Sequence, residues 1–122
     1  MLADAVLLLL AALAFGAVLA IVRLRRAGPA RIPLLVGVLH ASLGACGTAL
    51  AALAPSEATA ARAGAGEFRR IGVALLCFAL AVGLVMLRRR ILGRRVTTTQ
   101  VGIHALLAIS GVVVLGAYLA LG

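Results

Sequence analysis

Residues 5–22 have the sequence AVLLLLAALAFGAVLAIV, eighteen positions without a single charged side chain. A helix of about 20 such residues spans the hydrocarbon core of a bilayer, which is about 30 Å thick, at a rise of 1.5 Å per residue. Three further stretches of the chain have the same character. The four expected spans cover about residues 4–22, 33–54, 69–87 and 97–121. The sequence therefore predicts an all-α protein, a transmembrane four-helix bundle in which residues 1–122 form one membrane domain.

The composition also indicates a lipid bilayer as the surroundings of the chain. It is 65% hydrophobic and 12% charged, with a mean hydropathy of +1.23, whereas soluble domains are about 45–50% apolar and about 25% charged. The net charge of +9 comes from twelve basic residues, all of them arginines near expected helix ends or in loops. Such arginines are typical topology signals. We therefore expect contact with lipid and no binding of nucleic acid.

The arginines are unevenly distributed among the connections between the spans. Nine of them lie in the first and third connections: Arg23, Arg25, Arg26, Arg31, Arg88, Arg89, Arg90, Arg94 and Arg95. Because cytoplasmic loops carry an excess of arginine and lysine, these two connections are expected on the cytoplasmic side. The prediction is an integral protein of a bacterial inner membrane with both termini outside.

The two halves of the chain, about residues 1–62 and 63–122, look like copies of one unit. A shift of 63 residues superposes Asp4 on Glu67, Phe15 on Phe78 and Arg25 on Arg88, and a shift of 64 superposes His40 on His104 and Gly47 on Gly111. Each copy contains two spans, so the copies have the same orientation in the membrane. The sequence thus predicts two tandem helical hairpins related by a pseudo-twofold axis along the membrane normal.

His40 and His104 are the only histidines of the chain, and both lie inside expected spans. An ionisable side chain is costly in a membrane and by default indicates a functional site. Each histidine lies about eight residues into its span, roughly 11–12 Å from the cytoplasmic helix end. Two opposed neutral imidazoles at one level are the axial ligands of a haem iron. We predict one haem b, with His40 and His104 as its metal ligands.

Small and aromatic residues near the histidines suit a flat macrocycle. Gly44 and Gly47 follow His40 at helical spacing, and Gly111 follows His104 in the same way, which leaves helix surface that is poor in side chains. Phe15 and Phe78 are expected at a similar depth and could pack on the edges of the macrocycle.

The anionic propionates of a haem require polar partners on the arginine-rich side. Arg31, Arg94 and Arg95 are the predicted partners, with residues 97–99, all threonines, as hydroxyl donors.

The motif H-A-x-L-x-x-x-G occurs at residues 40–47 and again at 104–111. Through it the chain resembles membrane b-type cytochromes, including cytochrome b561-like proteins and the four-helix cytochrome b subunits that anchor membrane complexes. The resemblance implies electron transfer, often with a quinone or a peripheral redox partner. Whether the chain is an enzyme is left open, with a non-catalytic electron-transfer subunit favoured over an enzyme on its own. Proteins of the b561 type hold two haems with four histidines, whereas two histidines here suit one haem.

Other functions are open at this level. The histidines could hold another metal or a pigment, or could serve only as hydrogen-bonding groups between helices. The chain could be an assembly subunit of a larger membrane complex or a homo-oligomer. It could also be a small proton-coupled transporter, although its acidic residues lie at span ends or in a loop rather than inside a span.

Overall fold

The computed structural model describes residues 1–25, 34–55 and 66–121, so Arg31 lies outside the described part of the chain. The helices are α1 (Leu2–Arg25), α2 (Leu34–Leu53), α4 (Gly66–Ile91) and α5 (Thr98–Leu121). They cover the predicted spans closely, and α4 extends its span at both ends. Each is long and apolar enough to cross a membrane. These observations confirm the all-α four-helix bundle and support an integral membrane protein.

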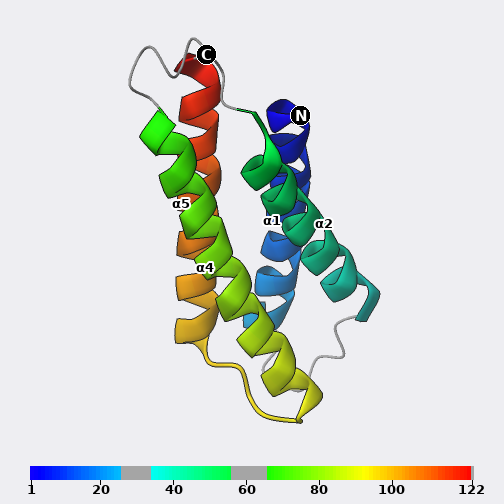
Figure 1. The fold of residues 1–122 in the computed structure, drawn as a ribbon. Helices are drawn as coiled ribbons and strands as arrows, with labels where there is room; N and C mark the ends of the chain where they lie inside the picture. Colours follow the sequence, from blue (N-terminus) through cyan, green and yellow to red (C-terminus); the bar gives the residue numbers. More distant parts are fainter. Residues whose placement is uncertain (26–33, 56–65, 122) are drawn as a thin grey trace.

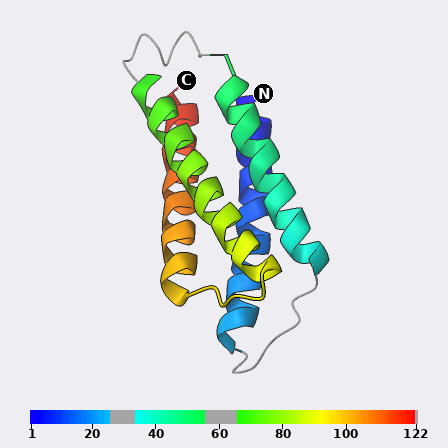
Figure 2. The ribbon, with the colours of Figure 1, turned by 60° about the horizontal axis from the view of Figure 1, so that its bottom comes forward.

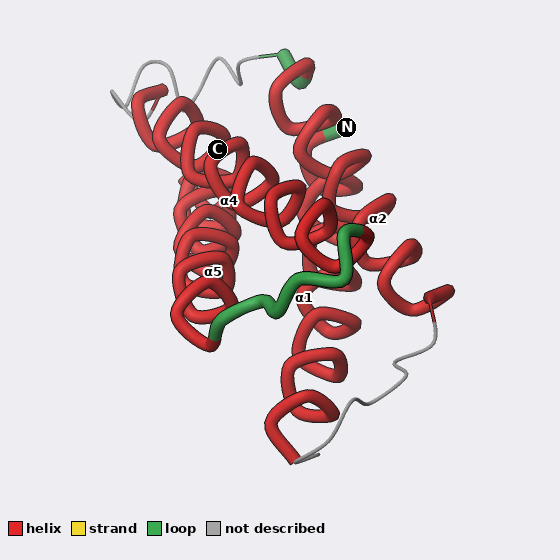
Figure 3. Tube along the Cα trace, turned by 90° about the horizontal axis from the view of Figure 1, so that it is seen from below, coloured by secondary structure: helices red, strands yellow, loops and turns green. Residues whose placement is uncertain are grey.

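The helices form two hairpins, α1 with α2 and α4 with α5 (Figure 1). The hairpins contact each other through smaller interfaces, α1 against α5 and α2 against α4. Viewed along the bundle, α5 and the start of α4 lie on one side and α1 with α2 on the other (Figure 3). Both termini lie at one end, whereas the connection from α4 to α5 and the last turn of α1 lie at the other end (Figures 1 and 2). We call the latter the arginine end, because Arg23, Arg25 and Arg88–Arg90 lie there.

Glycines allow the two helices of each hairpin to approach closely near the termini. A Cβ atom on Gly47 of α2 would lie 2.8 Å from Cγ of Leu9 in α1, and one on Gly111 of α5 would lie 2.8 Å from Cγ of Leu76 in α4. In a membrane, helices associate through such packing rather than through a hydrophobic force. Toward the arginine end the two helices of each hairpin diverge (Figures 1 and 2), which leaves room for larger side chains between them.

The buried core lies on the terminal side of the bundle. Leu115 and Tyr118 are the largest fully buried side chains, and they share one cluster with Leu2, Ala5 and Ala54. At this end Arg69 of α4 also donates hydrogen bonds across the hairpins, to the carbonyl oxygens of Ala51 (3.5 Å) and Ala54 (2.6 Å). These carbonyls belong to Ala51, in the last turn of α2, and to Ala54, the residue after its end, where no further helical N–H follows to bond them.

A tight turn links α4 to α5 and sets where α5 begins. Gly93 has a positive φ of 67°, and the amides of Gly93 and Arg94 bond the carbonyls of Arg90 (3.1 Å) and Arg89 (2.8 Å). This pair of bonds is the Schellman arrangement that ends many helices, with glycine in the left-handed position.

The start of α5 is fixed by reciprocal bonds between Thr97 and Gln100. The amide of Gln100 donates to the Thr97 hydroxyl (3.2 Å), and the amide of Thr97 donates to Oε1 of Gln100 (3.1 Å). This is a capping box, which satisfies two donors at the helix N-terminus. Arg89 of α4 donates to the same Oε1 (3.0 Å). The register of α5, and with it the height of His104, is thereby tied to the end of α4.

Candidate functional site: a facing pair of imidazoles

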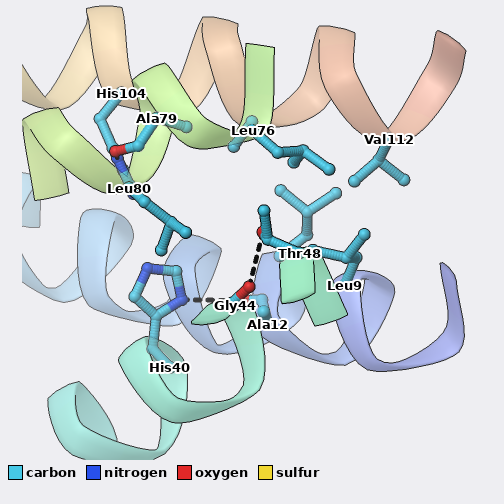
Figure 4. A pocket seen from close by; sticks show the side chains of 12 residues that line it. Leu9, Ala12, His40, Gly44, Thr48, Leu76, Ala79, Leu80, His104 and Val112 are labelled. Carbon is cyan, nitrogen blue, oxygen red and sulfur yellow. Dashed lines mark hydrogen bonds between the residues drawn. The ribbon is translucent and has the colours of Figure 1, made fainter. Parts of the chain in front are cut away.

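The structure brings His40 and His104 together inside the bundle. Their ring centroids are 5.8 Å apart, and the ring planes are inclined by 79°. His40 comes from α2 and His104 from α5, and each is the seventh residue of its helix. At 1.5 Å per residue this places both about 9 Å from the helix start. The two rings, one from each hairpin, approach from opposite sides of the interior (Figure 4).

Each imidazole is held by a backbone carbonyl of its own hairpin. Nδ1 of His40 lies 2.8 Å from the carbonyl oxygen of Ala12, and Nδ1 of His104 lies 2.8 Å from that of Ala79. A carbonyl oxygen can only accept, so Nδ1 carries the proton and donates in both rings. In a neutral imidazole Nε2 is then the atom with the free lone pair. Within the described residues, neither Nε2 atom has a hydrogen-bond partner.

A glycine one turn after each of these carbonyls makes room for the ring. A Cβ on Gly16 would lie 2.8 Å from Cε1 of His40, and a Cβ on Gly83 would lie 3.1 Å from Cε1 of His104. Because these positions carry no side chain, each ring lies directly against the backbone of α1 or α4. We call the two segments, residues 12–16 and 79–83, the imidazole seats.

The seats are visible in the sequence but were not part of the predicted site. Residues 12–16 read ALAFG and residues 79–83 read ALAVG, identical at four of five positions and separated by 67 residues. The closely packed pair Leu9 and Leu76 has the same separation. The short repeat ending in glycine is the signal that could have identified the seats.

These contacts align α1 with α4 in a different register from the sequence matches. A shift of 67 rather than 63 brings equivalent contacts together, a difference of four residues or about one helical turn, which keeps the same helix face. Phe15 and Phe78, paired under the shift of 63, are not in equivalent surroundings, since Phe15 is partly buried and Phe78 is 66% exposed.

A cavity of about 50 Å³ adjoins the two rings. Besides the histidines, its walls are formed by residues of all four helices, among them Leu13, Gly44, Thr48, Leu80, Ala108 and Val112 (Figure 4). Thr48 is the one other polar side chain in the lining, and its hydroxyl donates to the carbonyl of Gly44 (2.8 Å). No carboxylate lines the cavity, and the described residues contain no group of three or more His, Cys, Asp or Glu side chains that could hold a metal ion.

The other predicted site residues lie in different places. Gly44 lines the cavity, whereas Gly47 and Gly111 each pack against a leucine from the other helix of their own hairpin. Arg95 is exposed in the turn before α5. Of the predicted set, the structure therefore brings the two histidines and Gly44 together around the cavity.

No protein-family model, curated protein or solved structure matches the chain. The class that fold and site define is thus a four-helix membrane protein with a central imidazole pair, and its function has to be inferred from the chemistry of that pair.

The donor set fits a haem iron better than a bare metal ion. A structural zinc site needs four protein ligands and a catalytic one three, while a haem brings four equatorial nitrogens and needs only two axial ligands. One first-row metal ion bound by two imidazoles, at about 2.0 Å from each, needs Nε2 atoms about 4 Å apart.

The space in this structure is smaller than a porphyrin. A cavity of about 50 Å³ holds at most a few water molecules. A macrocycle between the rings therefore requires the two hairpins to stand further apart than they do here. The interfaces between hairpins are smaller than those within them, so separation along this boundary disturbs the least packing.

Proposed function

We propose that the protein is a membrane b-type cytochrome or cytochrome-like subunit that carries electrons through one haem b, with His40 and His104 as the axial ligands. The observation that supports this most is the state of the two rings. Both are held by an Nδ1–carbonyl bond at 2.8 Å, and neither Nε2 atom has a hydrogen-bond partner among the described residues. Histidines that bind metals characteristically donate the other ring nitrogen to a carbonyl or carboxylate, which fixes the tautomer.

The surroundings of the pair also suit a redox group. The walls of the cavity are almost entirely apolar, and a low-dielectric site with few hydrogen-bond donors influences the potential of a haem. In this proposal the carbonyls of Ala12 and Ala79 orient the ligands and increase their basicity. A bound haem would supply the one-electron chemistry, and the chain would supply binding, orientation and exclusion of water.

A haem held by both His40 and His104 would supply electron transfer rather than catalysis, because a substrate would find no free position at the iron. The electron partner would be a quinone or a peripheral redox protein. We further propose that the hairpins are related by a pseudo-twofold axis and that the arginine end faces the cytoplasm, with both termini outside.

The test is the haem content of the purified protein. The full chain is expressed with ample haem supply, purified in mild detergent, and assayed by absorption spectroscopy and by pyridine haemochrome quantification. We expect a Soret band and a reducible α-band with one haem per chain. H40A and H104A should each lose most of the haem, while S42A, a change at an exposed position of α2, should retain it.

A purified wild-type chain without these bands would contradict the proposal, as would unchanged haem content in both histidine variants. Copurification of partner chains without haem would instead favour an assembly subunit. Helix content, measured by circular dichroism, shows whether a variant that lacks haem is still folded.

A further inference from the structure

The two ends of the bundle differ in whether the chain supplies partners for its cations. At the end that carries the termini, the N-terminal ammonium pairs with Asp4 (2.9 Å) and Arg70 pairs with Glu67 (3.0 Å). Arg69 donates there to two main-chain carbonyls. The arginine end has no carboxylate among the described residues. Its described arginines are Arg23, Arg25, Arg88, Arg89, Arg90, Arg94 and Arg95.

Three of the seven arginines at the arginine end are engaged within the chain. Arg23 donates to the carbonyl of Val96, Arg89 donates to Gln100 (3.0 Å), and Arg90 also has an interaction of its own. The other four are exposed, and their side chains have no hydrogen-bond or ion-pair partner within the described part of the chain. These are Arg25, Arg88, Arg94 and Arg95. An anion that binds them has to come from outside the described residues.

Three of these four arginines flank an apolar pair in the connection from α4 to α5. Residues 88–95 read RRRILGRR, and we call them the basic turn. Ile91 is 75% exposed and Leu92 is 56% exposed. The Schellman bonds at Gly93 and the capping box of α5 fix the backbone on both sides. The basic turn therefore presents a preformed surface, so that little order has to be gained when a ligand binds.

The length of α4 indicates where the basic turn lies relative to a bilayer. The helix has 26 residues and is about 39 Å long, whereas the hydrocarbon core is about 30 Å thick. The charged side chains of Arg88–Arg90 belong to the part that extends beyond the core. This places the basic turn at the level of the lipid headgroups, with the phosphates on one side and the first acyl carbons on the other.

We propose that the basic turn binds anionic phospholipid. Arg88, Arg94 and Arg95 bond the headgroup phosphates, and Ile91 and Leu92 lie against the upper part of the acyl chains. Guanidinium groups match phosphate oxygens in geometry and charge. Clusters of four to eight basic residues next to a membrane helix are typical of binding to anionic lipid.

The exposed aliphatic pair favours a lipid over a soluble phosphate. A soluble phosphate would neutralise the arginines but would leave Ile91 and Leu92 in water, whereas a phospholipid covers both kinds of side chain. Arg25, at the end of α1, adds a fourth cation at the same end of the bundle. The inference does not depend on haem, since it uses neither histidine.

The experiment places a single tryptophan in the basic turn, because the natural chain has none. The full-length L92W protein is reconstituted in vesicles of phosphatidylcholine, to which brominated phosphatidylglycerol or brominated phosphatidylcholine is added. Bromine quenches tryptophan on contact, so the two titrations give the relative affinity of the two lipids beside residue 92. F68W is the matched control, since Phe68 is also partly exposed but lies at the opposite end of α4.

We expect phosphatidylglycerol to be preferred about fivefold or more at L92W, since one arginine near an anionic membrane contributes about that factor. At F68W the preference should be less than about twofold. In the L92W protein, replacing Arg94 and Arg95 together by glutamine should remove most of the preference, while lysine at both positions should keep part of it. R70Q should leave it unchanged, because Arg70 lies at the other end and is paired with Glu67.

Equal preferences at L92W and F68W would overturn the inference, as would a preference that the double glutamine variant retains. An equal loss in R70Q would show a general effect of net charge and would also overturn it. If inorganic phosphate abolishes the preference where chloride at the same ionic strength does not, the arginines bind a soluble phosphate instead of lipid. Helix content by circular dichroism, unchanged in every variant, shows that the fold is intact, and haem content measures the proposed function separately.

Discussion

The two hairpins hold their histidines in the same way but make different contacts at the end of the bundle that carries the chain termini. In the first, α2 ends at Leu53, and the carbonyl of the next residue, Ala54, accepts a hydrogen bond from Arg69. In the second, the position 64 residues later is Tyr118, which is buried in the cluster that also contains Leu2. What both hairpins share, a carbonyl, a glycine and a histidine, belongs to the site. The different contacts at the ends that carry the chain termini belong to packing.

A second difference lies in the cavity itself. Thr48 of α2 and Val112 of α5, again 64 residues apart, both line it. The two side chains are similar in shape, but only threonine brings a hydroxyl, and that hydroxyl bonds the carbonyl of Gly44. The polar side chains that both halves contribute to the cavity are therefore limited to the imidazoles.

The largest effect is expected from filling the imidazole seats. In G16A the new methyl group would stand 2.8 Å from Cε1 of His40, and in G83A 3.1 Å from Cε1 of His104. Each ring has to move and lose its bond to the carbonyl, at a cost of up to about 3 kcal/mol. Haem affinity, measured by titration, should fall by about a hundredfold in G16A and somewhat less in G83A.

The controls for the seats are G102A and G116A, where a Cβ meets no atom within 4 Å. Both should keep wild-type affinity. If G16A and G83A behave like these controls, the seats do not position the imidazoles.

The next effect concerns the closely packed glycines that are outside the cavity. A methyl group in G47A or G111A would press on a leucine at 2.8 Å and on a backbone oxygen at 3.1 Å, which cannot swing away. Overpacking of this kind costs about 2 kcal/mol. Unfolding by SDS titration should show a similar loss in both variants. A pronounced inequality would mean that the two hairpins are not packed alike.

A smaller loss of stability is expected from removing the contact of Arg69 near the chain termini. R69Q removes the donor that bonds Ala51 and Ala54, and we expect a loss of about 1 kcal/mol in the free energy of unfolding. R70Q breaks only an exposed pair with Glu67 and should change stability by less than about 0.5 kcal/mol. Equal losses in the two variants would argue against a specific role for Arg69.

The smallest effect is expected from replacing Thr48, the threonine that lines the cavity, by valine. T48V removes one hydrogen bond inside the membrane, and such bonds contribute about 0.6 kcal/mol on average. The free energy of unfolding should fall by about that amount in T48V, with haem content unchanged. A loss of haem in T48V would show that the hydroxyl contacts the ligand and that the two halves of the site are chemically different.

Much of the fold followed from hydropathy alone, because a membrane helix has to be apolar over its whole span. The predicted spans 33–54 and 97–121 differ from α2 and α5 by a residue or less at each end. The predicted span 69–87 stops before the arginines, whereas α4 continues through Arg88–Arg90 to Ile91. Charged residues limit the part of a helix that lies inside lipid but not the length of the helix itself. The Schellman turn at Gly93 is what ends it.

The site was predictable only in part. Two histidines inside apolar spans were conspicuous, and the structure brings them together. Their seats were not identified, because alanine and glycine are common in every span and the ALAFG and ALAVG repeat uses a spacing of 67 rather than 63. The sequence could not show that Gly44 lines the cavity while Gly47 and Gly111 pack against leucines. The neighbours of each helix face are determined by tertiary packing.

The most direct test of the central claim, one iron held by one imidazole from each hairpin, is low-temperature electron paramagnetic resonance of the oxidised protein. We predict a low-spin ferric signal typical of two histidine ligands in the wild type. Under saturating haem, H40A and H104A should each convert it to a high-spin signal. A high-spin signal in the wild type, or a low-spin signal that survives in both variants, would contradict the account.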